Sequence, residues 1–266
     1  MNAIPLLCVD AFTSKPFSGN PAAICLLEKQ APDDWMQSLA AEMNLAETAF
    51  PIKTGDNEFD LRWMTPTMEV DLCGHATLAT AHALWSKGLA DKSRPITFHT
   101  RSGVLKASLS ADGITLDFPL IATSPCPPQP ELIKSLGAVN PQSVVKAGPD
   151  YLVELCCAED VRNISPDLLS LAKIQMRGVI VTSTADEHDV DFVSRFFAPA
   201  AGINEDPVTG SAHCALAPYW AGKLAKTTFV AKQVSKRGGE LKVEIRGDRV
   251  LLTGNAVTVW EGEVIL

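Results

Sequence analysis

The sequences GHATLATAHALWSK at residues 74–87 and GSAHCALAPYWAGK at residues 210–223 decide the fold. Each begins with a glycine, continues with small or apolar residues around nearly the whole helical circumference, and ends with a lysine. A helix that is apolar on all sides must be enclosed by other structure. The two stretches therefore predict helices over residues 76–87 and 212–223, each buried within its own half of the chain.

The two stretches belong to an internal repeat with an offset of 136 residues. In the 43 positions from 74 to 116, eleven residues are identical at this offset, where background composition gives about three. Upstream, RWMTP at residues 62–66 aligns with RFFAP at residues 195–199 at an offset of 133. The chain is thus predicted to consist of two related halves. The identical pairs are Gly74/Gly210, Ala76/Ala212, Ala79/Ala215, Ala81/Ala217, Lys87/Lys223, Arg101/Arg237, Gly103/Gly239, Leu105/Leu241, Lys106/Lys242, Asp112/Asp248 and Leu116/Leu252.

A proline-rich segment separates the halves. Residues 119–130 (PLIATSPCPPQP) hold five prolines, which disfavour helix and central strand and are typical of an extended linker. Each half combines period-two segments typical of strands with one apolar helix and a hairpin, as at residues 103–118 and 239–254. We expect an α+β fold with an N-terminal domain over residues 1–120 and a C-terminal domain over residues 121–266, each a sheet wrapped around its helix.

A further amphipathic helix is expected over residues 33–45, outside the two enclosed helices. Asp33 or Asp34 is placed to act as its N-cap, because a short acidic side chain can accept a hydrogen bond from the first turn. Its apolar face is expected to pack against the outside of the first half.

The composition excludes several classes of partner. The chain has 266 residues, of which 46% are hydrophobic, and a formal net charge of -8. An acidic chain does not favour nucleic acid or an anionic membrane surface, where affinity comes from neutralising phosphates. No stretch reaches the roughly 20 apolar residues of a membrane helix, and residues 1–10 do not resemble a secretory signal. The seven cysteines lack the paired spacing of a zinc site, so we expect a cytoplasmic protein with reduced thiols.

Polar groups gather at both predicted helix starts, in DLCGHA at residues 71–76 and EDPVTGSA at residues 205–212. Helix amino termini present unpaired N–H groups and a positive dipole end, so two that converge on one cleft would bind a carboxylate. His75, beside such a terminus, is expected to stay neutral and to exchange protons. The spacing alone also allows His75 and Ser211 to be ordinary capping residues, and Asp206 to be a turn residue before a proline.

Glu47 is the remaining carboxylate of interest. It lies in NLAETAF at residues 44–50, where a charged residue enters an otherwise apolar, strand-like stretch. A lone glutamate there is usually solvated, but burial at a cleft would raise its pKa and suit it to general acid and base catalysis.

At these motifs the sequence resembles the PhzF-like family of phenazine-biosynthesis-like proteins, which share the diaminopimelate epimerase fold. The resemblance covers essentially the whole chain and implies two pseudo-symmetric halves, each a β-barrel around a central helix, in a homodimer. It also implies that the last strand, about residues 258–266, returns to the first half. The motifs that carry it are VDAF at 9–12, FSGNP at 17–21, ETAF at 47–50, RWMTP at 62–66, CGHAT at 73–77 and DPVTGS at 206–211.

The resemblance further implies a cofactor-independent isomerase that moves a proton on a small cyclic or unsaturated carboxylic acid, without metal or nucleotide. Glu47, as general acid and base, and His75, Asp206 and Ser211 match the family's catalytic residues. The helix-start N–H groups then hold the substrate carboxylate. The expected substrate-binding residues are Asn20, Cys73, Gly74, Thr209 and Gly210.

Two alternatives remain open. Cys73 precedes its glycine as the catalytic thiol does in diaminopimelate epimerase and proline racemase, which favours an amino-acid racemase or epimerase. The second helix start offers no matching thiol, so a two-thiol mechanism is disfavoured. The other alternative is a non-catalytic protein that binds a small ligand, or interacts with a partner, on the same fold.

Overall fold

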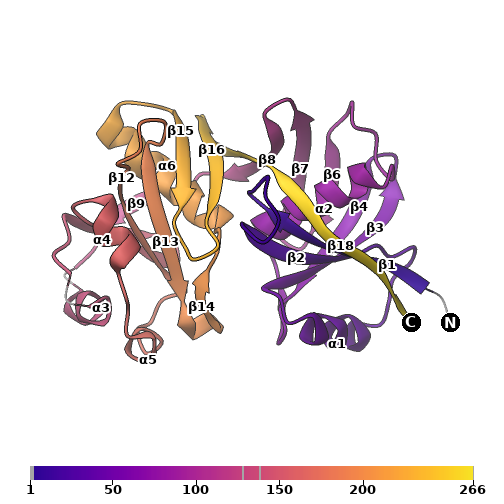
Figure 1. Ribbon diagram of the computed structural model, residues 1–266, viewed down its shortest axis with the longest axis horizontal. Helices are drawn as coiled ribbons and strands as arrows, with labels where there is room; N and C mark the ends of the chain where they lie inside the picture. The colour runs from indigo at the N-terminus through magenta and orange to yellow at the C-terminus, as the bar shows by residue number, and fades with distance from the viewer. Residues whose placement is uncertain (1–2, 128, 138, 266) are drawn as a thin grey trace. The chain divides into compact units, whose positions relative to one another are not determined.

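The computed structural model describes residues 3–127, 129–137 and 139–265 (Figure 1). Pro128 of the proline-rich segment and Leu266 of the last strand lie outside the described residues. The chain forms two compact units, one of Met1–Phe118 with Leu252–Leu266 and one of Pro119–Leu251. We describe each unit by itself.

The first unit is a mixed sheet with two helices. Its strands pair in the order β18, β1, β2, β3, β4, β6, β7, β8, with parallel pairing between β2 and β3 and between β4 and β6. The other neighbours in this order are antiparallel. The elements are β1 (Ala3–Ala11), β2 (Asn20–Cys25), α1 (Asp33–Met43), β3 (Glu47–Gly55), β4 (Glu58–Met64), β5 (Glu69–Val70), α2 (Gly74–Ser86), β6 (Ile96–Thr100), β7 (Gly103–Ser110), β8 (Gly113–Pro119) and β18 (Ala256–Ile265).

Helix α2 is enclosed by strands of its own unit, as Figure 1 shows. It contacts β1, β2, β3, β7 and β18, and ten of its 13 residues are buried. Its many alanines let the strands approach closely, while Leu78, Leu84 and Trp85 each contribute about 2 kcal/mol of apolar burial. The predicted enclosed helix is confirmed, and it begins at the repeated glycine, Gly74.

The second unit repeats this pattern with additional short helices. Strand β11 pairs in parallel with β12, and β13 with β15, as β2 does with β3 and β4 with β6. The elements are β9 (Thr123–Pro125), α3 (Pro130–Ser135), β10 (Ser143–Ala147), β11 (Asp150–Glu154), α4 (Ala158–Asn163), α5 (Leu168–Leu171), β12 (Val179–Thr184), β13 (Phe192–Ala198), the 3-10 helix η1 (Pro199–Ala201), β14 (Ile203–Asp206), α6 (Gly210–Leu224), β15 (Thr228–Gln233), β16 (Gly239–Arg246) and β17 (Arg249–Gly254).

Helix α6 is the counterpart of α2. Nine of its 15 residues are buried, and Phe192 of β13 stacks on Trp220 and on His213, with ring centroids 5.9 and 6.1 Å apart. The second predicted enclosed helix is therefore also confirmed. No helix in the described part of the chain is long and apolar enough to cross a membrane.

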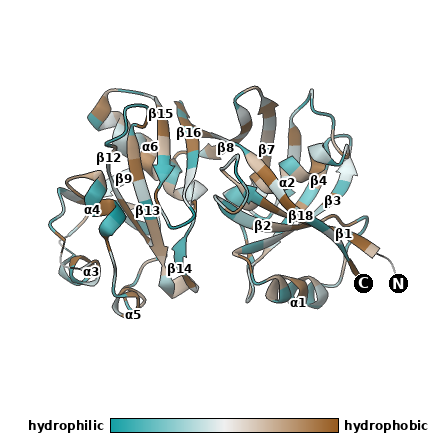
Figure 2. Ribbon diagram, viewed as in Figure 1, coloured by the Kyte–Doolittle hydropathy of each residue, from teal (hydrophilic) through white to brown (hydrophobic). Residues whose placement is uncertain are grey.

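Two local expectations were wrong. Helix α1 has Pro32 as its N-cap, with no side-chain cap bond, and the Asp34 carboxylate accepts from the N–H of Trp35 instead. Figure 2 shows that α1 carries both hydrophobic and hydrophilic residues, consistent with its packing on β3 and β4 through one face. The proline-rich segment is not a plain linker, since it forms β9, which pairs with β10, and Pro130 begins α3.

Candidate active site

Four buried side chains of the first unit meet at the start of α2. Strand β2 begins with Asn20, and the neighbouring parallel strand β3 begins with Glu47. Cys73 and His75 flank Gly74, the first residue of the helix. The exposed fraction is 8% or less for each of these four residues. The structure thus brings together Glu47 and His75 with three of the predicted binding residues.

The His75 ring lies between an amide and a carboxylate. Its Nδ1 is 3.1 Å from Nδ2 of Asn20, and its Nε2 is 3.2 Å from Oε2 of Glu47. An amide nitrogen can only donate, so Nδ1 is an acceptor and the ring proton is on Nε2, the nitrogen that faces the carboxylate. The Sγ of Cys73 lies 3.5 Å from Nδ1 and can donate its proton to the same acceptor.

Burial keeps this imidazole neutral. Removal from water disfavours the charged ring and lowers the pKa of His75 to about 3. The predicted neutral state is therefore confirmed, with burial as its cause. At neutral pH the His75 ring therefore carries a single proton and no charge.

Three of these residues also form a group of possible metal ligands. Ligand atoms of Glu47, Cys73 and His75 lie within 4.8 Å of one another. The carboxylate of Glu47 approaches Nε2, while the thiol of Cys73 approaches Nδ1. These two contacts lie on opposite sides of the ring, and an ion bound by all three residues would use only one of the ring nitrogens.

The second unit carries the other predicted residues at the start of α6. Thr209 is the N-cap, and its hydroxyl donates to Oδ2 of Asp206, the last residue of β14, at 2.5 Å. Gln233 fixes both, because its Oε1 accepts from the Thr209 N–H at 2.8 Å and its Nε2 donates to the Asp206 carbonyl at 2.6 Å. Asp206 is therefore a buried, hydrogen-bonded carboxylate rather than a solvated turn residue.

Ser211 is the second residue of α6 and not its cap. Its Oγ accepts a hydrogen bond from Nη2 of Arg177 at 3.1 Å. Arg177 in turn forms a two-pronged pair with Asp150, with Nε to Oδ1 at 2.8 Å. Burial alone would lower the pKa of Arg177, but the hydrogen bonds and charge of Asp150 and the charge of Asp206 raise it overall. A permanent cation therefore lies beside the second helix start.

Comparison with known proteins agrees with this geometry. The family model for phenazine biosynthesis-like proteins matches residues 9–262. The chain belongs to this PhzF family. An uncharacterized isomerase of Halalkalibacterium halodurans is 50% identical over 273 residues, covering 100% of both chains. A crystal structure of a PhzF family protein from Enterococcus faecalis superposes with a TM-score of 0.95 at 43% identity, covering 100% of each chain.

A more distant likeness shows the fold alone. A hydroxyproline epimerase from Agrobacterium vitis superposes with a TM-score of 0.63 at 14% identity, over 98% of this chain and 92% of that one. The mixed fold of this PhzF family member is therefore shared with epimerases of the proline racemase type.

A pair of arginine–glutamate contacts braces both helix starts of this PhzF family chain. Arg62 donates through Nε and Nη2 to Glu69, both at 2.8 Å, and Arg195 donates in the same way to Glu205, at 2.6 and 3.0 Å. Each pair ties the strand before the helix (β4 or β13) to the short strand that leads into it. We call these two pairs the arginine clamps. They keep the two helix starts on equivalent supports.

Sequence reasoning missed Arg177, Asp150 and Gln233. The signal that could have found Arg177 is strand register, because Phe50 pairs with Arg62 in the first unit as Val181 pairs with Arg195 in the second. Glu47 lies three residues before Phe50, and Gly178 lies three residues before Val181. Gly178 is therefore the counterpart of Glu47, and Arg177 directly precedes it.

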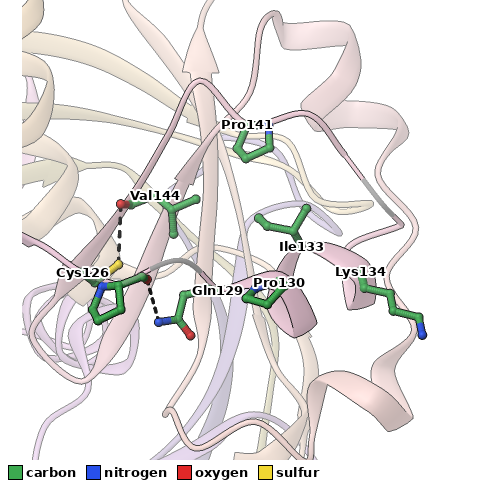
Figure 3. A pocket seen from close by; sticks show the side chains of 8 residues that line it. Cys126, Gln129, Pro130, Ile133, Lys134, Pro141 and Val144 are labelled. Carbon is green, nitrogen blue, oxygen red and sulfur yellow. Dashed lines mark hydrogen bonds between the residues drawn. The ribbon is translucent and has the colours of Figure 1, made fainter.

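The second unit also contains a cavity of about 590 Å³ beside α3 (Figure 3). Its lining is mainly apolar, and at one edge the Sγ of Cys126 donates to the Val144 carbonyl. The described residues that line it include neither a carboxylate nor a histidine, so they offer no carboxylate–imidazole pair for proton transfer. The lining residues are Cys126, Pro127, Gln129, Pro130, Ile133, Lys134, Pro141 and Val144.

Proposed function

We propose that this protein is a cofactor-independent isomerase that shifts a proton on a small cyclic or unsaturated carboxylic acid, with Glu47 as general acid and base. The observation that carries the proposal is the buried Glu47 carboxylate 3.2 Å from the Nε2 of a neutral His75. Support also comes from the relative of Halalkalibacterium halodurans, which is named an isomerase.

The reaction begins with Glu47 taking a proton from a carbon next to the substrate's π system. The electron pair of the broken C–H bond moves into that π system, and the carboxylate becomes a carboxylic acid. Glu47 then returns the proton to a more distant carbon, so the double bonds shift and no other atom is gained or lost. His75 does not take the proton, because burial disfavours its imidazolium form. Its neutral ring instead lies against the carboxylate, with Nε2 3.2 Å from Oε2 of Glu47.

The helix starts bind and stabilise the substrate in this proposal. The N–H groups at Gly74 and Gly210 hold the substrate carboxylate, with Asn20, Cys73 and Thr209 around it. Charge that develops on the substrate in the transition state is stabilised by donors already in position, which is the largest single contribution in many enzymes.

Asp206 and Ser211 of the second unit assist on the same substrate. Their hydrogen bonds to Thr209 and Arg177 hold both side chains in fixed positions. We further propose that the two units are pseudo-symmetric epimerase-like domains, each a β-barrel around its helix, and that the enzyme acts as a homodimer. Sedimentation equilibrium would give twice the chain mass of 28.5 kDa for a dimer, whereas a single-chain mass would reject it.

Proton NMR in D2O tests the chemistry. The wild-type protein would be incubated with a panel of dihydroaromatic acids, unsaturated small acids and α-amino acids, beside Glu47→Gln and Cys73→Ser. The proposal predicts C–H exchange in an unsaturated acid that is lost in Glu47→Gln and kept in Cys73→Ser. Glu28, an exposed carboxylate of the same unit, provides the matched control Glu28→Gln, which is expected to exchange at the wild-type rate.

A racemase that uses Cys73 is the second candidate, because its thiol contacts the His75 ring at 3.5 Å. Exchange at the α-carbon of an amino acid, lost in Cys73→Ser, would favour it. The counterpart of Cys73 is Thr209, and the thiol of Cys214 deeper in α6 has its pKa raised to about 12 by burial, so the second unit offers no reactive thiol at its helix start. If no compound exchanges but a carboxylate raises the melting temperature, a binding protein is the better description.

A further inference from the structure

The pair of Arg177 and Asp150 is the most tightly organised charged group that the proposed chemistry does not use. Asp150 has a side chain only 2% exposed, and it accepts hydrogen bonds from both Nε and Nη2 of Arg177. A buried carboxylate that engages a guanidinium through both oxygens fixes the plane of the guanidinium group. The remaining Nη2 donor of Arg177 points to Ser211.

The backbone beside Arg177 is equally constrained. A Cβ atom at Gly178 would lie 2.4 Å from Cζ of Phe196, so no side chain larger than hydrogen fits there. The Arg177 N–H donates to the Pro149 carbonyl, and the Gly178 carbonyl accepts from the Tyr151 N–H. The Arg177 guanidinium also lies over the Phe196 ring, at 5.5 Å from its centroid. The arginine is therefore held from its backbone to its tip.

The hydrogen bond from Arg177 determines whether the Ser211 hydroxyl donates or accepts at that contact. A serine hydroxyl has one donor and two acceptor sites. The guanidinium has no acceptor, so Ser211 must use an acceptor lone pair toward Arg177 and cannot direct its proton there. Its single O–H is then left to donate elsewhere, at the start of α6.

We propose that Arg177, locked by Asp150, is a positioning residue that keeps Ser211 as a hydrogen-bond donor toward a carboxylate oxygen of the substrate. The inference rests on the proposed function, in which Ser211 faces the substrate. It assigns to the second helix start a preference for carboxylates over neutral amides of the same shape, because a hydrogen bond to an ionised acceptor is stronger than one to a neutral acceptor.

The test is a double-mutant cycle on ligand binding. Benzoate serves as an unreactive analogue of a cyclic unsaturated acid, and its dissociation constant would be measured by calorimetry for wild type, Ser211→Ala, Arg177→Gln and the double variant. Each single variant is expected to weaken benzoate binding about tenfold, the value of one hydrogen bond to a charged acceptor. The double variant is expected to be weakened by the same tenfold, because both changes remove one interaction.

Three further measurements separate positioning from other effects. Arg177→Lys keeps the charge but cannot pair with Asp150 and Ser211 at once, so it is expected to bind benzoate as weakly as Arg177→Gln. Arg162 forms a similar two-pronged pair with Asp186, and its variant Arg162→Gln is the matched control, with unchanged affinity. Benzamide, the neutral isostere, is expected to bind Ser211→Ala and wild type within about twofold of each other.

Several results would overturn the proposal. A double variant weakened about a hundredfold would show that Arg177 and Ser211 act independently. Wild-type affinity in Arg177→Lys would mean that only the charge matters, and wild-type affinity in Ser211→Ala, or no benzoate binding by the wild type, would mean that Ser211 is not a carboxylate donor. Failure of the proposed function is seen separately, as persistent C–H exchange in Glu47→Gln.

Discussion

The starts of α2 and α6 occupy equivalent positions of the repeat, yet His75 at one corresponds to Ser211 at the other, and Cys73 to Thr209. The contacts that support the two helix starts are similar. Both starts carry an arginine clamp, and the fourth residue after each N-cap returns a side-chain hydrogen bond to the N-cap carbonyl, from Thr77 in one unit and His213 in the other. The two helix starts therefore differ in their reactive side chains but share the same supporting contacts.

The divergence separates proton transfer from substrate binding. The first start holds a carboxylate and a neutral imidazole, which suit proton transfer to and from carbon. The second holds hydroxyl groups and a fixed guanidinium, which suit hydrogen bonding to an anion. Gly178, the counterpart of Glu47, cannot carry any side chain because of the Phe196 ring. The second unit therefore has no equivalent base at this position.

Acid should weaken both units alike, and this is the largest effect expected. Burial lowers the pKa of His75 to about 3 and of His213 to about 4, against 6.5 in the unfolded chain. Between pH 7 and 5 the unfolded state gains protons that the folded state does not, so stability is greatest above pH 6.5 and falls as the pH drops. Each histidine is expected to lower the free energy of unfolding by about 2 kcal/mol between pH 7 and pH 5.

Urea unfolding at pH 7 and pH 5, followed by circular dichroism, measures this loss. His75→Gln and His213→Gln are each expected to remove about half of it, and the exposed His188 provides the control variant His188→Gln. If one variant removed all of the pH dependence and the other none, the burial of the two histidines would not be equivalent.

The arginine clamps should contribute similar stability in the two units. Arg62→Met and Arg195→Met each leave a partly buried glutamate without its main partner, and each is expected to cost about 2 kcal/mol of unfolding free energy. Arg94→Met, which removes an exposed pair, is expected to cost less than about 1 kcal/mol. Thermal denaturation of the three variants measures the ranking, and a cost confined to one clamp would break the proposed equivalence.

Cys73→Ser is expected to have the smallest effect. The hydroxyl can donate to Nδ1 of His75 as the thiol does, and Asn20 keeps its own hydrogen bond to the same nitrogen. Exchange of an unsaturated acid in D2O is therefore expected to fall less than about tenfold. A loss as complete as that of Glu47→Gln would move the chemistry from the carboxylate to the thiol.

The sequence allowed prediction of the enclosed helices because their apolar circumference and the repeat are local signals. The meeting of Glu47 with His75 was reached only through a family resemblance, since it depends on how β2, β3 and α2 come together. The fixed offset of 136 could not reveal Arg177 either. Insertions change the offset to 131 at β3 and β12, where Phe50 corresponds to Val181, so the counterpart of Glu47 is found only from the strand pairing.

The most direct test compares Glu47→Gln and Ser211→Ala in one exchange assay in D2O, with the unsaturated acid that the wild type exchanges. The account predicts that Glu47→Gln lowers the maximal exchange rate about a thousandfold, while Ser211→Ala mainly raises the substrate concentration needed for half of that rate. Full exchange by Glu47→Gln, or a maximal rate lost equally in both variants, would contradict the assignment of proton transfer to the first unit and substrate binding to the second.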